Sequence, residues 1–247
     1  MLELGWTASA RVESSRERVV AVVVPACDEE ERVGRVIGTM PARVARIVLV
    51  DDGSRDATVA RAESVGDARL VIVSHGARRG VGAAIESGYR RAFDDGADVV
   101  VVMAGDAQMD PDDLESLIAP VASGEVGYAK GNRLDHPRAT RDMPLVRRLA
   151  GSVLSRLTSL ATGRRVRDSQ CGYTAIDRQS WRALSGAPLW SSYGYPNDVL
   201  VRLARAGVVV RDVPVRPVYV GKRGGMRARH ALLVVPYVIA RALVRGD

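Results

Sequence analysis

Four short runs of aliphatic residues dominate the first half of the chain, at 19–26, 45–52, 69–75 and 98–104. Each run is almost continuously apolar and rich in β-branched residues, which is typical of strands buried on both faces of a parallel sheet. Between these runs, apolar residues recur with a helical period over about 29–39, 55–65, 80–94 and 112–122. This alternation predicts right-handed βαβ units, and therefore an α/β domain with a mostly parallel central sheet flanked by helices.

The second half of the chain is less regular. Helices are expected near 143–161, 178–184 and 196–206, a loop over 162–176 and strands near 208–218. Residues 1–17 show no periodic core, so we expect a loose arm there. Residues 226–247 are expected to form an apolar and basic helix. No linker or internal repeat divides the remainder, which predicts a single domain over about 18–225.

The charge of the chain narrows the classes of partner. A formal net charge of +7 comes almost entirely from arginine, since Lys130 and Lys222 are the only lysines. Basic surfaces suit phosphorylated ligands, anionic membranes or nucleic acid. Aromatic residues make up only 4% of the chain, and no zinc-finger or RNP-like pattern occurs, so nucleic acid is the weakest of these hypotheses.

Cysteine usage and hydropathy bear on location. Two cysteines, Cys27 and Cys171, do not suggest a disulfide framework and favour a reducing cytosol. The chain does not open with a secretory signal pattern. The longest apolar run, 231–244, is too short to span a bilayer and contains Pro236 and Arg241. We therefore expect a cytoplasmic protein, with peripheral contact at the inner face of the plasma membrane as an open alternative.

Polar residues follow the predicted strands, where ligands bind in sheets of this kind. Asp51 and Asp52 stand side by side after the second run. Turn and capping chemistry explains the residues that follow them but not this pair, which favours a ligand contact. The segment 78–88 contains glycines and two arginines, but it lacks the third glycine of a dinucleotide fingerprint and follows the third strand. It remains a candidate for a phosphate or base contact.

Asp106 and Gln108 alternate along the chain just after the fourth strand, so both side chains can face one side. Oxygen donors of this type suit hard cations such as Mg²⁺ or Mn²⁺, which often share their ligands with substrate phosphates. The alternative is a polar turn before a helix that Asp110 or Asp112 caps. From these residues alone, both hypotheses stay open.

Six segments together resemble family-2 glycosyltransferases, and most of all the dolichol-phosphate or polyprenyl-phosphate sugar synthases. They are VVVPACDEEERVGRVI, VLVDDGSRDAT, GARRGVGAAIESGYRRA, MAGDAQMDP, KGNR and DSQCGYTAI, in that order. The resemblance covers roughly residues 18–225 and implies a GT-A fold. It also implies a nucleotide-binding half at about 18–110 and an acceptor half at about 111–225.

The resemblance implies specific roles for the residues of the first half. It implies a nucleotide site formed by Pro25, Ala26, Asp28, Glu29, Asp51, Asp52, Arg79, Gly80, Gly105 and Asp106. The family usually has tyrosine and asparagine where this chain has Cys27 and Asp28. The segment AGDAQ resembles the family's Asp-x-Asp-x-Gln metal motif, with Ala104 in place of the first aspartate. We therefore expect Asp106 and Gln108 to hold Mg²⁺ or Mn²⁺, weakly in the absence of substrate.

The resemblance also implies roles on the acceptor side. The implied catalytic residues are Asp106, Arg133 and Asp198. The implied sugar and acceptor contacts are Asp168, Gln170, Asn197, Lys222 and Arg223. Each of these has a plainer alternative; Asp198, for example, also suits the first turn of a helix.

The expected activity is an inverting transfer of a hexosyl or N-acetylhexosaminyl group from a UDP- or GDP-sugar to a polyprenyl or dolichyl phosphate. One alternative is transfer to a hydroxyl of a soluble molecule, which needs a general base such as Asp198. Another is a non-catalytic sugar-nucleotide binder, motivated by Ala104. A membrane-interface role for 229–247, a core or dimer role for the same segment, and a homo-oligomer all stay open.

Overall fold

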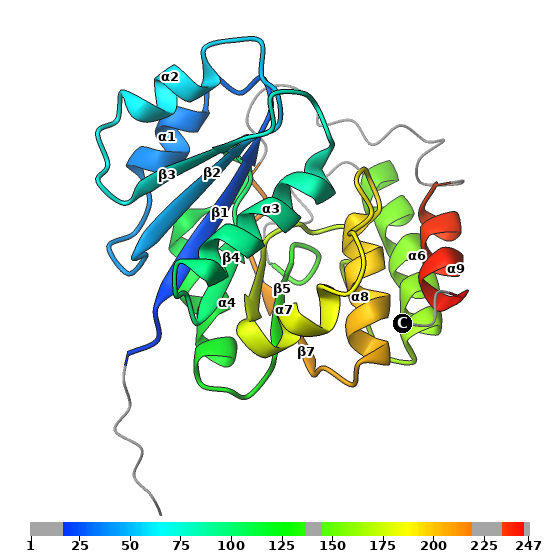
Figure 1. Ribbon diagram of the computed structural model, residues 1–247. Coiled ribbons are helices and arrows are strands. Elements are labelled where there is room, and N and C mark those ends of the chain that lie inside the picture. The colour runs from blue at the N-terminus through cyan, green and yellow to red at the C-terminus, as the bar shows by residue number, and fades with distance from the viewer. Residues whose placement is uncertain (1–16, 137–144, 219–233, 245–247) are drawn as a thin grey trace, which may run out of the picture.

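The protein is described by a computed structural model over residues 17–136, 145–218 and 234–244. These residues form one α/β domain around a seven-stranded sheet (Figure 1). The strands are β1 Val20–Ala26, β2 Arg46–Asp51, β3 Leu70–Ser74, β4 Val99–Val102, β5 Tyr128–Asn132, β6 Thr174–Asp177 and β7 Val210–Pro214. The helices are α1 Val33–Gly38, α2 Thr58–Glu63, α3 Val81–Asp94, α4 Leu114–Ala122, α6 Leu145–Thr162, α7 Arg178–Leu184, α8 Tyr195–Arg205 and α9 Val235–Val244, with a 3₁₀ turn at Pro111–Asp113.

The strand order is β3-β2-β1-β4-β6-β5-β7. The first four of these strands are parallel to one another, and β5 is parallel to β7. Strand β6 is antiparallel to both of its neighbours, β4 and β5. The expected α/β architecture with a mostly parallel sheet is confirmed, with β6 as the exception within it.

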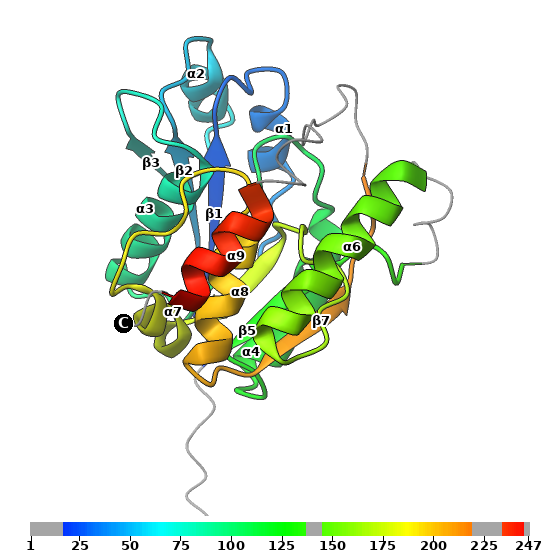
Figure 2. The same ribbon diagram turned by 90° about the vertical axis from the view of Figure 1, so that its right-hand side faces the viewer.

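Alternating side chains of the strands build two cores, one on each face of the sheet. In β1, Val22 and Val24 contribute to the core under α1 and α4, whereas Ala21 and Val23 contribute to the core under α3, α7 and α8. This period of two explains why continuous aliphatic runs are required in the central strands. Helices α6 and α9 lie outside α8 and form a further layer with their own small core (Figures 1 and 2).

The strands that follow β1 in the chain are added first on one side of β1 and then, from β4 on, on its other side. Strands β2 and β3 make up the first of these sides. The carboxyl ends of β1 and β4 therefore flank a topological switch point, where open α/β sheets bind their ligands. Ala26 and Gly105 meet there, and the Gly105 N–H donates to the Pro25 carbonyl at 3.1 Å.

Two strands and the C-terminal segment differ from the expectations. Strand β5 was not anticipated, and the expected loop over 162–176 ends within β6. In the segment expected to be apolar and basic, helix α9 buries Val235, Val238, Ile239 and Ala242 against the molecule. The core-helix alternative therefore holds for that face. None of the helices that the structure describes is long and apolar enough to cross a membrane.

Candidate active site

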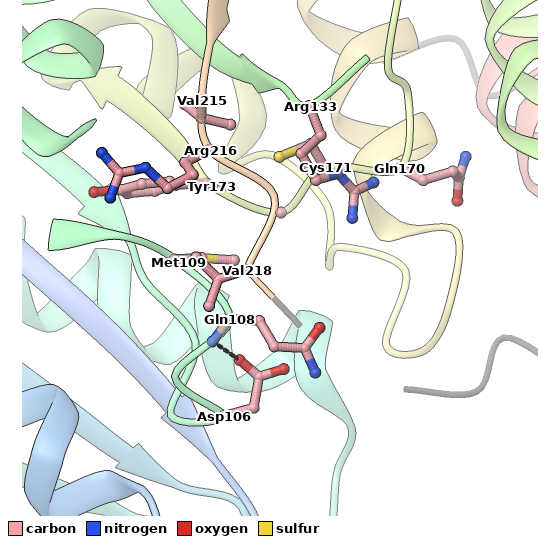
Figure 3. Close-up of a pocket in the computed structure, with 11 residues that line it drawn as sticks. Asp106, Gln108, Met109, Arg133, Gln170, Cys171, Tyr173, Val215, Arg216 and Val218 are labelled. Atoms are coloured by element: carbon pink, nitrogen blue, oxygen red, sulfur yellow. Dashed lines mark hydrogen bonds between the residues drawn. The ribbon is translucent and has the colours of Figure 1, made fainter. Parts of the chain in front are cut away.

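Two cavities open at the carboxyl edge of the sheet, and Asp106 lines both. The first, of about 200 Å³, is the β1 cavity and is lined by Pro25, Ala26, Cys27, Glu29, Asp52, Arg78, Val81, Ala84, Ala104, Gly105 and Asp106. The second, of about 150 Å³, is the β5 cavity and is lined by Asp106, Gln108, Met109, Arg133, Gln170, Cys171, Gly172, Tyr173, Val215, Arg216 and Val218 (Figure 3). A ligand that occupies both cavities passes Asp106.

A tight turn after β4 presents Asp106 and Gln108 to the β5 cavity. The Gln108 N–H donates to Asp106 Oδ1 at 3.0 Å, and Ala107 between them has a φ of 57°. This left-handed conformation is costly for a residue with a Cβ atom and is typical of functional sites. Both side chains point into the same part of the cavity (Figure 3). The turn therefore brings one carboxylate and one amide oxygen together.

These two side chains fit a hard divalent cation only as part of a larger ligand set. Carboxylate and amide oxygens are suitable ligands for Mg²⁺ or Mn²⁺, which take about six ligands. Within the part of the chain that the structure describes, no cluster of three or more His, Cys, Asp or Glu side chains could hold a metal. Ala104, two residues before Asp106, adds no oxygen. Asp106 and Gln108 alone would therefore leave the coordination of such a cation incomplete.

Asp52 organises the loop that borders the β1 cavity. Its carboxylate accepts hydrogen bonds from His75 Nδ1 and from the backbone N–H groups of Arg79 and Gly80, each at 2.8 Å. The other ring nitrogen of His75 lies 2.9 Å from Ser87 Oγ. Burial alone raises the pKa of Asp52, but these three hydrogen bonds outweigh it and hold the pKa below its usual value. Asp52 is therefore an anionic anchor for residues 75–80, while its direct contact with a nucleoside stays a prediction.

Asp51 and Asp28, which were also predicted for the nucleotide site, do not line the β1 cavity. Asp51 accepts hydrogen bonds from the Ser54 N–H and the Ser74 hydroxyl. Asp28, at a φ of 57°, accepts the Arg55 N–H at 2.8 Å. Both carboxylates therefore stabilise turns in this structure, and their expected contacts with the nucleotide stay predictions.

Glu29 remains beside the β1 cavity and pairs with Arg32 at 2.9 Å. Burial first, and then the nearby Asp106 charge, raise the pKa of Glu29, although the Arg32 hydrogen bond opposes them. Glu29 therefore brings a second carboxylate close to Asp106.

Glycines at the start of α3 allow close backbone packing. The Gly80 N–H is bonded to Asp52, and the Gly82 N–H donates to the Ser191 carbonyl at 3.0 Å. A Cβ atom at Gly82 would lie 1.9 Å from the Trp190 carbonyl oxygen. The 190–191 backbone thus covers this helix start, and the expected place of Gly80 in the nucleotide site stays a prediction.

Arg133 reaches the β5 cavity while buried Asp168 holds it in place. The guanidinium donates to both Asp168 carboxylate oxygens at 2.8 and 3.0 Å, and the Arg133 N–H adds a third bond at 3.1 Å. Burial raises the pKa of Asp168, but the charges and hydrogen bonds of Arg133, together with Lys130, lower it to about 2. The fully buried Lys130 donates to the Asp168 carbonyl at 2.6 Å and pairs with Asp212 at 2.8 Å. Asp168 therefore positions Arg133, and its carboxylate also accepts the Gln170 N–H at 3.3 Å.

Gln170 lines the β5 cavity and is fixed by a buried polar network. Its amide donates to Asn197 Oδ1 at 3.0 Å and to Ser169 Oγ at 2.9 Å. Asn197 is completely buried and donates in turn to Thr158 at 2.7 Å. Asn197 therefore reaches the cavity through Gln170 in this structure, and its expected contact with a sugar stays a prediction.

Asp198 does not line either cavity. Its carboxylate accepts the Trp190 N–H at 3.0 Å and lies 3.7 Å from the Arg202 guanidinium, with only 4% of the side chain exposed. The carboxylate lies in the first turn of α8 and holds the segment before that helix. In this arrangement Asp198 is not positioned as a general base.

Several residues of the site were not predicted. Arg78 lines the β1 cavity, whereas Arg79 was expected there. Tyr173 and Arg216 line the β5 cavity, and Arg216 pairs with Asp110 at 2.7 Å. The Arg-Arg pair at 78–79 was a visible signal, but nothing in the sequence chooses between its members. Lys222 and Arg223 lie outside the described residues, as do residues 1–16 of the predicted arm.

Comparison with known proteins provides independent findings. The family model described as "Glycosyl transferase family 2" matches residues 21–184. A UDP-N-acetylglucosamine–dolichyl-phosphate N-acetylglucosaminyltransferase of Methanococcus voltae is 26% identical, covering 82% of this chain and 87% of that protein. A polyprenol monophosphomannose synthase of Mycolicibacterium smegmatis is 28% identical, covering 87% and 84%. These similarities extend over most of both chains.

A solved structure supports the architecture. The glucosyl-3-phosphoglycerate synthase of Mycobacterium tuberculosis superposes with a TM-score of 0.70 over 93% of this chain and 81% of that protein. The two sequences are 22% identical, so this likeness concerns the fold.

Proposed function

The chain belongs to glycosyl transferase family 2 and has the GT-A fold, and from that premise we propose that it transfers a sugar from a nucleotide-diphosphate sugar to a polyprenyl phosphate. The relatives named above as dolichyl-phosphate and polyprenol transferases support this choice of acceptor. A UDP- or GDP-linked hexose or N-acetylhexosamine is the proposed donor. The observation that carries the proposal is the placement of Asp106 between the two cavities.

In this proposal the nucleoside occupies the β1 cavity. Asp52 fixes the loop that carries Arg78 to the cavity wall, and Glu29 lies beside it. Cys27 lies where a base would enter, which makes this position a candidate for selecting the base. The diphosphate would then lie beside Asp106, at the boundary with the β5 cavity.

Asp106 and Gln108 are the residues that would hold Mg²⁺ or Mn²⁺ together with the donor diphosphate. When bound, the cation supplies positive charge that offsets the charge of the leaving nucleoside diphosphate. Asp106 is kept in place by the Gln108 N–H, so its carboxylate needs little reorganisation. Solved complexes of the M. tuberculosis synthase contain Mn²⁺ with UDP, which agrees with this proposal.

In the β5 cavity, Arg133 would orient the acceptor phosphate. Guanidinium groups suit phosphate oxygens, and Asp168 prevents this guanidinium from turning away. An acceptor oxygen attacks the anomeric carbon from the side opposite the diphosphate, and the bond from that carbon to the diphosphate oxygen breaks. The configuration at the anomeric carbon is inverted.

The buried position of Asp198 favours a phosphate acceptor over a hydroxyl. A phosphate monoester has a second pKa near 6 and is largely ionised at neutral pH, so it needs no general base. A hydroxyl acceptor needs a base within hydrogen-bond reach. Asp198 was the candidate for that role, but its carboxylate is bound to Trp190 and nearly inaccessible.

The acceptor can be identified with purified protein, Mn²⁺ and a panel of nucleotide sugars. We expect a glycosylated short-chain polyprenyl phosphate by mass spectrometry, with release of the nucleoside diphosphate. Asp198→Asn should keep most of this activity, because no proton transfer to it is required. A loss of about 10²-fold or more in this variant, with unchanged folding, would favour a hydroxyl acceptor. Turnover with soluble alcohols and none with the lipid phosphate would refute the proposal.

A further inference from the structure

Helix α6 exposes its large aliphatic side chains to solvent. Leu145, Leu149, Val153, Leu157 and Leu160 are between 39% and 81% exposed. Their spacing of four, four, four and three residues places them along one face of the helix. At about 1.5 Å per residue, the stripe is roughly 22 Å long. Exposed apolar side chains gathered on one face in this way are typical of an interaction surface.

The polar contacts on the inner face of α6 explain why the helix cannot rotate to bury its exposed aliphatic side chains. Ser155 accepts the Ser169 N–H at 3.0 Å, and Thr158 accepts from Asn197 at 2.7 Å. Both side chains are buried, and Ser159 bonds to the backbone of Val166. Rotation of the helix would leave these polar groups without partners, at a cost of about 1–3 kcal/mol each. The helix therefore buries hydroxyls and presents leucines.

The charged residues of α6 and of the segment that follows it are basic. Residues 145–167 contain six arginines and no aspartate or glutamate. Arg156 is exposed within the stripe, and Arg164 and Arg165 are exposed just beyond its end. Arginine can lay its aliphatic stem along an apolar surface while its guanidinium reaches an anionic group.

Helix α9 lies beside α6 (Figures 1 and 2) and also carries exposed apolar side chains. Tyr237, Leu243 and Val244 are exposed on α9. Tyr237 meets the Trp190 ring edge-on at 5.9 Å, and Arg241 lies 5.2 Å above the same ring. Of the eleven exposed large apolar side chains on the described residues, five lie on α6 and three on α9. The exposed apolar surface is therefore concentrated on this side of the molecule.

We propose that the exposed face of α6, extended by α9, docks on a bilayer that contains anionic lipids. The leucines enter the headgroup–acyl boundary, and the arginines meet the lipid phosphates. A second copy of the chain fits this face less well. A two-fold interface places the same patch on both sides, so the arginines would face arginines. The choice of a lipid partner rests on the proposed function, since a polyprenyl phosphate acceptor lies in such a membrane.

Binding of the full-length protein to sedimenting vesicles tests this surface. The vesicles are phosphatidylcholine alone, or phosphatidylcholine mixed with phosphatidylglycerol, without polyprenyl phosphate or nucleotide sugar. We expect binding to the mixed vesicles. Leu149→Gln combined with Leu160→Gln should lower the partition coefficient at least about tenfold, because two leucine side chains no longer enter the bilayer. Arg156→Gln should lower it about fivefold, and only on the anionic vesicles.

The matched control is Val65→Gln, which removes an exposed aliphatic residue after α2 and should bind as wild type. Unchanged vesicle binding by the double leucine variant, or no vesicle binding by the wild type, would overturn the proposal that this face docks on a membrane. A wild-type dimer that the leucine variant converts to a monomer, with vesicle binding unaffected, would assign the face to a second copy. Transfer to a detergent-dispersed polyprenyl phosphate, measured separately, reports on the proposed function and does not depend on docking.

Discussion

Asp106 is a single carboxylate in a position where two cavities meet. Because Ala104 contributes no charge, we expect Asp106→Asn to lower kcat/KM at least about 10²-fold, since the diphosphate charge is left without its cation. Steady-state transfer with Mn²⁺ measures this loss. The matched variant Ala104→Asp adds a carboxylate and should tighten the binding of Mn²⁺ in the absence of donor. Electron paramagnetic resonance measures this binding. Full activity of chelator-treated protein would contradict the metal hypothesis.

Asp168 makes a pH-dependent contribution to stability. Its pKa of about 2 lies below the usual value of about 3.8. A depressed pKa stabilises the fold above the unfolded-state value, and the contribution disappears as the pH falls toward 2. The pKa difference corresponds to about 2 kcal/mol. Urea unfolding of wild type and Asp168→Asn should therefore show a stability difference that narrows between pH 4 and pH 2. A difference that is constant over this window would show that Asp168 titrates normally.

At the scale of elements, α3 approaches β1 closely because Gly88 has no side chain. A Cβ atom there would lie 2.2 Å from Val23 Cγ1. We expect Gly88→Ala to destabilise the protein by about 1–3 kcal/mol through overpacking, and Val23→Ala in the same background to recover part of the loss. Gly151→Ala in α6, where no atom lies within 4 Å, is the control and should be neutral or stabilising. Equal unfolding midpoints for the two alanine variants would refute the packing argument.

The elements that could be predicted from the sequence are those that depend on residues close together in the chain. The aliphatic runs predicted β1 to β4, because strands buried on both faces need such residues at every position. Strand β5 escaped prediction since Lys130 and Asn132 are polar, and their burial depends on partners far along the chain. The hydrogen-bond partner of Asp198 could not be predicted for a similar reason. Its carboxylate points to Trp190, a contact that depends on the path of the segment before α8.

For the whole molecule, a nucleoside diphosphate with Mn²⁺ should bind across the carboxyl edge and stabilise the native state. At a hundredfold excess over Kd, binding contributes about 2.7 kcal/mol. For a domain of this size we expect a rise in Tm of about 5 °C or more. Thermal unfolding with UDP and with GDP compares the two bases, and Asp106→Asn should lose the Mn²⁺-dependent part. No stabilisation by any nucleoside diphosphate would argue against a sugar-nucleotide site.

The antiparallel strand β6 has a consequence for the order of folding. The sheet β3-β2-β1-β4 is built entirely from residues 20–102, whereas β4 pairs on its other side with residues 174–177. Closing that pair requires a loop of more than 70 residues, which slows its formation relative to the local βαβ units. We expect the N-terminal half to acquire protection from hydrogen exchange first. Asp106 then enters its final surroundings only when β6 docks, so the two cavities form in sequence.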